Sequence, residues 1–181
     1  ALKREAVEQG EDPSICYFDC DVTDAFYKVP LLEAEQKYFV LSFKGEYYVW
    51  KRLGQGSLNG PTLLCRFSAL LGRMTQGLID DRHATAQFYV DDPLLAIRAQ
   101  EDEAQHIICR IILLWLSLGL ELATHKAQLA REATWIGYTI KDESLDAIMS
   151  IKESFMKDFC KDVQRIARQR RTQLSVLTSF T

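Results

Sequence analysis

Cysteine and histidine are scarce and scattered in this chain. There are five cysteines and three histidines among 181 residues, and no Cys-x-x-Cys pair occurs. An odd, dispersed set of cysteines excludes a disulfide framework, and neither residue type has the spacing of zinc ligands. We therefore expect reduced cysteines that serve as packing residues. The five are Cys16, Cys20, Cys65, Cys109 and Cys160.

Long apolar runs and an excess of positive charge are also absent. No apolar stretch is long enough to cross a bilayer and no signal peptide opens the chain. We therefore expect an intracellular protein, cytoplasmic or nuclear, with no membrane partner. The formal net charge of −3 does not indicate a chain that is basic as a whole. A local basic patch could still bind nucleic acid.

What the chain does contain is enough apolar material for a core. Hydrophobic residues make up 48% of the sequence, which suits one domain with or without a small appendage. The order of expected elements is strand, hairpin, helix, hairpin, helix, hairpin, helix. This order predicts an α+β fold with an antiparallel sheet flanked by helices. Because the first residue is not Met and no closing signal ends the sequence, we expect a fragment of a longer polypeptide.

Apolar residues at helical spacing predict two long helices, from Pro61 to about Ile79 and from Glu101 to Gly119. Residues 1–9 predict a short exposed helix. The capping box Ser150-Ile151-Lys152-Glu153 predicts the start of a last helix. From Lys152 to Arg171 there are seven basic and three acidic residues. This last helix is either a solvated surface or a phosphate contact.

The most informative stretch is Phe88-Tyr89-Val90-Asp91-Asp92. A strand over residues 85–90 ends in two adjacent carboxylates, and residues 93–97 return as a second strand. Adjacent carboxylates repel each other unless a positive charge, such as a divalent ion, lies beside them. An Asp-Asp pair is also common in turns, because both side chains can bond backbone amides. The pair alone leaves both interpretations open.

A third carboxylate follows an earlier strand. Residues 15–20 predict a strand, and Asp21 lies just past its end. If the two strands are neighbours in one sheet, their tips meet, and three carboxylates could hold two divalent ions about 3.5–4 Å apart. Such a pair of ions suits phosphoryl or nucleotidyl transfer, and Mg²⁺ fits oxygen ligands of this kind. Further on, residues 135–140 predict a strand with one glycine, half of a hairpin that closes at residues 141–143.

Five motifs in this order resemble those of the reverse transcriptases of retroviruses and retrotransposons. The third is the Tyr-x-Asp-Asp form that is the best-known signature of that family. The fifth resembles the family's primer-grip hairpin. The motifs are Asp21–Phe26, Leu53–Gly56 with Pro61, Tyr89–Asp92, Leu118–Leu120 followed by Lys126, and Trp135–Tyr138.

The resemblance implies an RNA-directed DNA polymerase, which adds dNTPs to a primer 3′ end on an RNA or DNA template. Asp21, Asp91 and Asp92 would be the catalytic carboxylates and, with the backbone carbonyl of Val22, would hold two Mg²⁺ or Mn²⁺ ions. Residues implied to contact the dNTP are Thr23, Asp24, Ala25, Phe26, Gln55, Gly56 and Lys126. Residues implied to contact the template–primer are Tyr89, Val90, Trp135, Ile136, Gly137 and Tyr138.

The resemblance also implies a division of the chain. Residues 1–13 would be a remnant of the fingers, residues 14–147 the palm, and residues 148–181 the start of a helical thumb. The expected partners are the template–primer, dNTPs, and the missing fingers and RNase H segments of a parent polyprotein. One alternative is a degenerate palm that binds nucleic acid or a protein without catalysis. Another is an RNA-dependent RNA polymerase, against which the bulky Phe26 argues, because a large ring at this position would clash with a 2′-hydroxyl.

Overall fold

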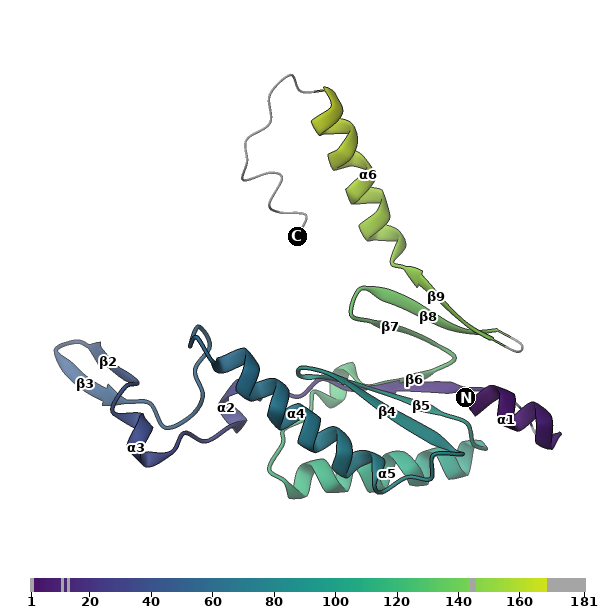
Figure 1. Cartoon of the computed structure of the whole chain (residues 1–181), viewed down its shortest axis with the longest axis horizontal. Helices are drawn as coiled ribbons and strands as arrows, with labels where there is room; N and C mark the ends of the chain where they lie inside the picture. The colour runs from purple at the N-terminus through teal and green to yellow at the C-terminus, as the bar shows by residue number, and fades with distance from the viewer. Residues whose placement is uncertain (1, 11, 13, 144–145, 169–181) are drawn as a thin grey trace.

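The computed structural model describes residues 2–10, 12, 14–143 and 146–168 (Figure 1). Its centre is a four-stranded antiparallel sheet in the order β4-β5-β1-β6, joined by a three-stranded sheet β7-β8-β9 and a hairpin β2-β3. This arrangement confirms the predicted α+β fold with an antiparallel sheet. The elements are α1 (Leu2–Gln9), β1 (Cys16–Asp19), α2 (Ala25–Lys28), α3 (Glu33–Gln36), β2 (Val40–Phe43), β3 (Glu46–Val49), α4 (Gly60–Gln76), β4 (Ala84–Tyr89), β5 (Asp92–Ile97), α5 (Glu101–Ser117), η1 (Thr124–Lys126), β6 (Gln128–Ala130), β7 (Glu132–Trp135), β8 (Tyr138–Glu143), β9 (Asp146–Ile151) and α6 (Glu153–Arg168).

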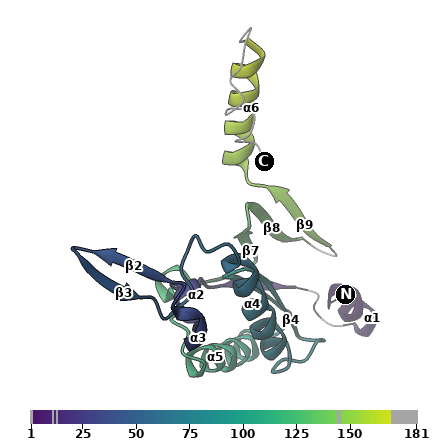
Figure 2. The same ribbon diagram turned by 60° about the vertical axis from the view of Figure 1, so that its left-hand side comes forward.

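The main sheet buries side chains on both of its faces. Successive residues of β5 alternate between two apolar clusters, as the period of a strand requires. Leu95 and Ile97 belong to the larger cluster, which α4 and α5 cover with residues such as Leu64 and Trp115. Figures 1 and 2 both place these two helices together on one side of the sheet. The prediction that the apolar stripes of the two long helices are core is confirmed in part. Leu64 and Leu71 of α4, and Ile107, Ile108, Ile111 and Trp115 of α5, are core. Other apolar residues at helical spacing are exposed, namely Leu63, Leu70, Met74, Leu78 and Leu118.

The second face of the main sheet packs against the three-stranded sheet and α1. Leu94 of β5 and Tyr17 of β1 form a smaller cluster with Ile140 of β8 and Leu2 of α1. The expectation that residues 1–9 form an exposed helix is therefore wrong in part, because Leu2, Lys3 and Ala6 are buried. The Glu143 carbonyl that accepts from Lys3 lies 140 residues further along the chain, where no local pattern could indicate it.

The end of α4 reaches the edge strand of the main sheet. The Gln76 side chain donates from Nε2 to the Ala84 carbonyl at 3.3 Å and accepts at Oε1 from the Ala86 amide at 2.8 Å. It also donates to Asp81. Strand β4 is the outer strand on this side, and Gln76 thus bonds two of its outward-facing backbone groups.

Two local predictions are wrong. The strand expected over residues 135–140 is interrupted by a turn at Ile136-Gly137, so that β7 ends before it and β8 begins after it. Ser150 does not cap the last helix, because it lies in β9 opposite Thr139. Pairing between strands outcompetes the local capping pattern. The expected boundary between residues 147 and 148 falls within β9.

Helix α6 and the β2-β3 hairpin extend away from the main sheet in different directions (Figures 1 and 2). No residue of α6 within the described range is buried. Its basic side chains form exposed pairs within the helix, Lys157 with Glu153, Lys161 with Asp158 and Arg165 with Asp162. These pairs favour the solvated-surface interpretation for the described part of the helix. Arg170 and Arg171, and with them residues 169–181 of the thumb segment predicted over residues 148–181, lie outside the described residues.

All five cysteines are free thiols. Cys20 is buried and meets the expected packing role, whereas Cys65, Cys109 and Cys160 are exposed and do not. Separately, none of the helices in the described part of the chain is long and apolar enough to cross a membrane.

Candidate active site

The end of β1 lies beside the turn between β4 and β5. Strands β1 and β5 are antiparallel neighbours, with Asp19 opposite Leu94. One residue past Asp21, the Val22 amide points to the Asp91 carbonyl at 3.5 Å. The strand over residues 85–90 that ends in the Asp91-Asp92 pair is β4, and it is not itself the neighbour of β1, because the returning strand β5 lies between them. The tips still meet, through the β4-β5 turn. The sheet therefore brings Asp21 to the same place as Asp91 and Asp92.

The turn itself is a tight two-residue connection, Val90-Asp91, closed by the pair Tyr89–Asp92. Val90 has φ 57°, a left-handed conformation that is unfavourable for a β-branched side chain. Val90 packs against the larger core cluster, and this contact helps to hold it in place. Pro93 is opposite Phe88 of β4. In an antiparallel pair, hydrogen-bonded and non-hydrogen-bonded positions alternate, and Pro93 occupies a non-hydrogen-bonded one because it follows the closing pair. Its missing N–H therefore costs that ladder nothing.

Two carboxyl groups at this junction, those of Asp92 and Asp19, have raised pKa values. Burial, followed by the negative charges of Asp21, Asp19 and Asp91, raises the pKa of Asp92 to about 6. Burial also raises the pKa of Asp19, and the charge of Asp21 adds to the effect. A carboxylate that is partly desolvated beside like charges binds a proton, or another cation, more readily than one in water.

Asp19 is a site residue that sequence reasoning missed. One of its carboxylate oxygens, Oδ1, is buried and has no hydrogen-bond partner. Asp19 is two residues after Tyr17, so in an extended strand both side chains lie on the same face of the main sheet. This is the face that packs against the three-stranded sheet. The alternation Asp19-Cys20-Asp21 at a strand end was the signal that could have found it.

Replacing Asp92 with asparagine is expected to stabilise the fold at high pH. A raised pKa means that the folded state holds its proton more tightly than the unfolded state, so stability is lost as pH rises from about 4 through about 6. Asp92→Asn removes this penalty, and we expect a gain of about 1–2 kcal/mol at pH 8 after allowance for solvent screening of a half-buried group. At pH 4 the gain should vanish.

Urea midpoints of both proteins at the two pH values, with a chelator present, measure this difference. Asp158→Asn is the matched control, because that carboxylate is exposed on α6 and pairs with the neighbouring Lys161. Its effect should not grow with pH. A gain for Asp92→Asn that is equal at pH 4 and pH 8 would contradict the electrostatic cause.

Lys126 supplies the positive charge nearest to Asp21. Its Nζ lies 2.7 Å from Asp21 Oδ2, and this hydrogen bond, with the charge of Asp21, raises the pKa of Lys126. Backbone hydrogen bonds hold the segment after β1 beside the segment that leads to Lys126. The Thr23 amide donates to the Glu121 carbonyl, and the Ala123 amide donates to the Asp21 carbonyl. Both charged side chains are about half exposed, so the pair adds little to stability. Its importance is that it places a cation at the carboxylates.

The predicted primer-grip hairpin also reaches the turn. The Trp135 indole donates from Nε1 to the Asp92 carbonyl at 3.1 Å. Ile136 and Gly137 form the β7-β8 turn with φ 44° and 83°, which explains the glycine at the second position. Tyr138 begins β8 opposite Trp135.

The predicted nucleotide contacts lie in two segments. Thr23 and Asp24 lead from the carboxylate junction into α2, where Ala25 is buried and Phe26 half-buried. A Cβ on Gly60 would lie 3.3 Å from the Phe26 ring, so the start of α4 supports this ring. Gln55 and Gly56 lie on the exposed loop before α4. Within the described ranges, no hydrogen bond joins Gln55 or Tyr138 to the carboxylates.

Residues 4–140 match the family model described as "Reverse transcriptase (RNA-dependent DNA polymerase)". The chain belongs to this family. Among curated relatives of this reverse transcriptase chain, the Gag-Pro-Pol polyprotein of squirrel monkey retrovirus is 29% identical over 132 residues, or 69% of the chain. The Gag-Pro-Pol polyprotein of human T-cell leukemia virus 2 is 32% identical over 60% of the chain. The chain spans only 7% and 8% of the length of these two relatives.

Solved structures agree on the fold of the reverse transcriptase chain. A foamy viral protease-reverse transcriptase in complex with RNA/DNA hybrid matches with a TM-score of 0.70 and 21% identity, over 91% of this chain and 20% of that one. The same kind of protein in complex with double-stranded DNA matches with a TM-score of 0.68 and 22% identity, over 91% of this chain and 26% of that one. The helix and antiparallel-sheet architecture is therefore that of a reverse transcriptase.

The donor set at the junction of β1 with the β4-β5 turn suits a hard divalent cation. Asp21, Asp91 and Asp92 offer only oxygen ligands. The pKa of Asp92 is raised first by burial and then by neighbouring negative charge, and a cation would offset the second of these causes. As the described side chains stand, however, no three or more His, Cys, Asp or Glu converge closely enough to hold a metal ion. The chemistry of the donors fits the ion, while their placement would have to tighten around it.

Proposed function

We propose that this chain is the palm of an RNA-directed DNA polymerase that adds dNTPs to a primer 3′ end. The observation that supports this best is the junction of β1 with the β4-β5 turn, where Asp21 lies beside Asp91 and Asp92. We retain the division into residues 1–13, 14–147 and 148–181 as fingers remnant, palm and start of the thumb. The polyprotein relatives support a place within a longer protein.

In the proposed mechanism, Asp21, Asp91, Asp92 and the Val22 carbonyl would hold two Mg²⁺ or Mn²⁺ ions. When bound, these ions would activate the primer hydroxyl and stabilise the leaving pyrophosphate. Lys126 is held at Asp21, from where its ammonium could neutralise phosphate charge or give a proton to the leaving group.

The positions of the residues around the Asp91-Asp92 turn also support the binding partners in this proposal. The Trp135–Tyr138 hairpin, tied to the Asp92 carbonyl, would position the primer end together with Tyr89 and Val90 of the turn. Thr23 to Phe26, with Gln55 and Gly56, would surround the dNTP. The solved relatives in complex with RNA/DNA hybrid and double-stranded DNA support a template–primer as the partner of this chain too.

Primer extension on an RNA template, with dNTPs and Mg²⁺ or Mn²⁺, tests the proposal directly. Extension that stops when a chelator is added would support it. One observation favours the alternative, a palm that binds without catalysis. Among the described residues, no three or more His, Cys, Asp or Glu side chains are arranged to hold a metal ion. Binding of a labelled RNA/DNA hybrid without any extension, even with the rest of the polymerase supplied, would favour that alternative.

The Phe26→Ala variant is expected to lose discrimination against ribonucleotides. A large ring at this position would clash with a 2′-hydroxyl, and the ring is supported by Gly60. We expect the ratio of kcat/KM for dNTP to that for NTP to fall by about 100-fold. Phe26→Tyr retains the ring and is the control that should keep the ratio. Unchanged sugar selectivity in Phe26→Ala would refute this role for Phe26.

A further inference from the structure

The three-stranded sheet β7-β8-β9 is attached to the rest of the molecule at two ends. Near the carboxylates, the Trp135 indole donates to the Asp92 carbonyl at 3.1 Å. At the other end, Lys3 of α1 meets Asp142 of β8. The apolar cluster with Leu2 and Ile140 fills the space between. Because apolar packing has no preferred direction, the two polar attachments fix how the sheet is oriented.

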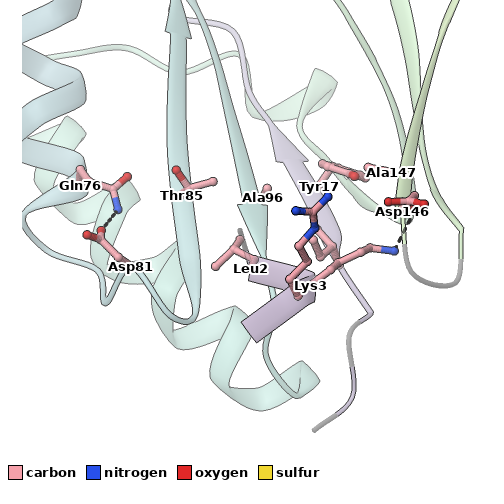
Figure 3. A pocket seen from close by; sticks show the side chains of 11 residues that line it. Leu2, Lys3, Tyr17, Gln76, Asp81, Thr85, Ala96, Asp146 and Ala147 are labelled. Atoms are coloured by element: carbon pink, nitrogen blue, oxygen red, sulfur yellow. Dashed lines mark hydrogen bonds between the residues drawn. The ribbon is translucent and has the colours of Figure 1, made fainter. Parts of the chain in front are cut away.

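Lys3 is a buried lysine whose ammonium group contacts oxygen atoms of Asp142, Asp146 and Glu143. Its side chain is 7% exposed and forms an ion pair with Asp142, whose side chain is 5% exposed. Asp142 Oδ1 has no hydrogen-bond partner, so this contact is one of charge attraction. Lys3 Nζ donates to the main-chain carbonyls of Asp146 at 3.0 Å and Glu143 at 3.4 Å. Figure 3 shows Lys3 reaching from α1 to Asp146, beside a cavity of about 770 Å³ that none of the predicted site residues lines. Lys3 thus joins α1 to β8 and β9 together.

Strand β8 connects the two attachments. It is the central strand of its sheet, bonded to β7 on one side and to β9 on the other. Asp142 and Tyr138 lie four residues apart on it, a distance of about 13 Å along an extended strand. Tyr138 is paired with Trp135 across the turn. A shift of β8 at Asp142 is therefore passed along a stiff strand to Trp135.

We infer that Lys3 is a positioning residue that, through its ion pair with Asp142, sets where the Trp135–Tyr138 hairpin stands over the Asp91-Asp92 turn. The effect on primer placement rests on the proposed function, whereas the effect on Trp135 does not. Stability alone is a weak reason for such a pair, because an apolar pair of similar volume is often as stable or more so. What apolar side chains would lose is the charge attraction to Asp142 together with the directional hydrogen bonds from Lys3 Nζ to the carbonyls of Asp146 and Glu143.

The test replaces Lys3 and Asp142 with apolar residues, which stay buried and cannot form the polar contacts. The double variant Lys3→Met with Asp142→Leu, in the 181-residue chain, is expected to keep its urea midpoint. Hydrogen exchange of the Trp135 indole N–H, followed by NMR, should become about tenfold faster. Lys141→Met is the matched control, since it removes the exposed Lys141–Glu132 pair from the same strand, and it should leave Trp135 unchanged. Unchanged exchange at Trp135 in the double variant, or equal acceleration at the buried Trp115 indole, would overturn the inference.

A kinetic test separates positioning from folding. In primer extension, the double variant should raise KM for the primer–template about tenfold and leave KM for dNTP within about twofold. The exchanged pair, Lys3→Asp with Asp142→Lys, should recover part of the loss. Equal changes in both constants would contradict a positioning role. If no primer is extended even with the rest of the polymerase supplied, the proposed function fails, and the Trp135 exchange still decides the inference.

Discussion

Asp91→Asn is expected to lower primer extension by about a thousandfold or more, the equivalent of about 4 kcal/mol at the transition state. The side chain lies at the tip of the β4-β5 turn, beside the end of β1. An amide keeps the size of the carboxylate and loses its charge, so the turn should survive while the proposed affinity for divalent cations falls. Primer extension measures the rate, and titration calorimetry with Mg²⁺ and dNTP measures the binding.

The chain contains a matched control for this variant, because a second adjacent pair of aspartates stands at the far end of β4. There Asp80 bonds Arg82, which holds the pKa of Asp80 well below its usual range, and Asp81 accepts a hydrogen bond from Gln76. Asp81→Asn should leave extension unchanged. If Asp91→Asn and Asp81→Asn extended primers equally well, Asp91 would have no role in catalysis.

Trp115→Ala is expected to cost about 3–5 kcal/mol of stability. Trp115 is fully buried in the larger cluster, with its ring edge-on to Phe88 of β4 at 5.9 Å between centroids. Its Nε1 donates to Thr75 Oγ1 at 2.9 Å, and Thr75 is itself buried on α4. One side chain therefore joins α5, α4 and the main sheet. Urea unfolding of the 181-residue chain measures the loss.

Two further variants keep this prediction open to refutation. Trp115→Phe keeps most of the volume and removes the donor to Thr75, so we expect a smaller loss of about 1–3 kcal/mol. Leu113→Ala lies on the exposed face of the same helix and should change stability by no more than about 0.5 kcal/mol. A loss at Trp115→Ala as small as that at Leu113→Ala would show that the core does not depend on this contact.

The elements that the sequence predicts well are those whose signals are local. The β4-β5 hairpin follows from two short apolar runs around Asp91, and the stripe from Leu64 to Leu71 follows from helical spacing. The sequence argues against the turn at Ile136, because a β-branched residue rarely adopts a positive φ. Ser150 fits a capping pattern and is used in a strand instead.

The long-range contacts of the candidate site could not be predicted from the residues alone. Lys126 meets Asp21 across 105 positions, and Trp135 meets Asp92 across 43. The family resemblance assigned these residues to one site without indicating which atoms meet. Lys3 had no signal at all, because a lysine in a polar segment is normally solvated. Only the fold shows that it is buried beside Asp142.

The Gln76 side chain has a consequence for how copies of this chain behave towards one another. An outer strand with open N–H and C=O groups is a template for pairing with a strand of another molecule, the first step of aggregation. By bonding Ala84 and Ala86, Gln76 uses two of these groups on β4. The side-chain amide of Gln76 therefore makes edge-to-edge pairing with another molecule less favourable at β4, the strand that leads into the Asp91-Asp92 turn.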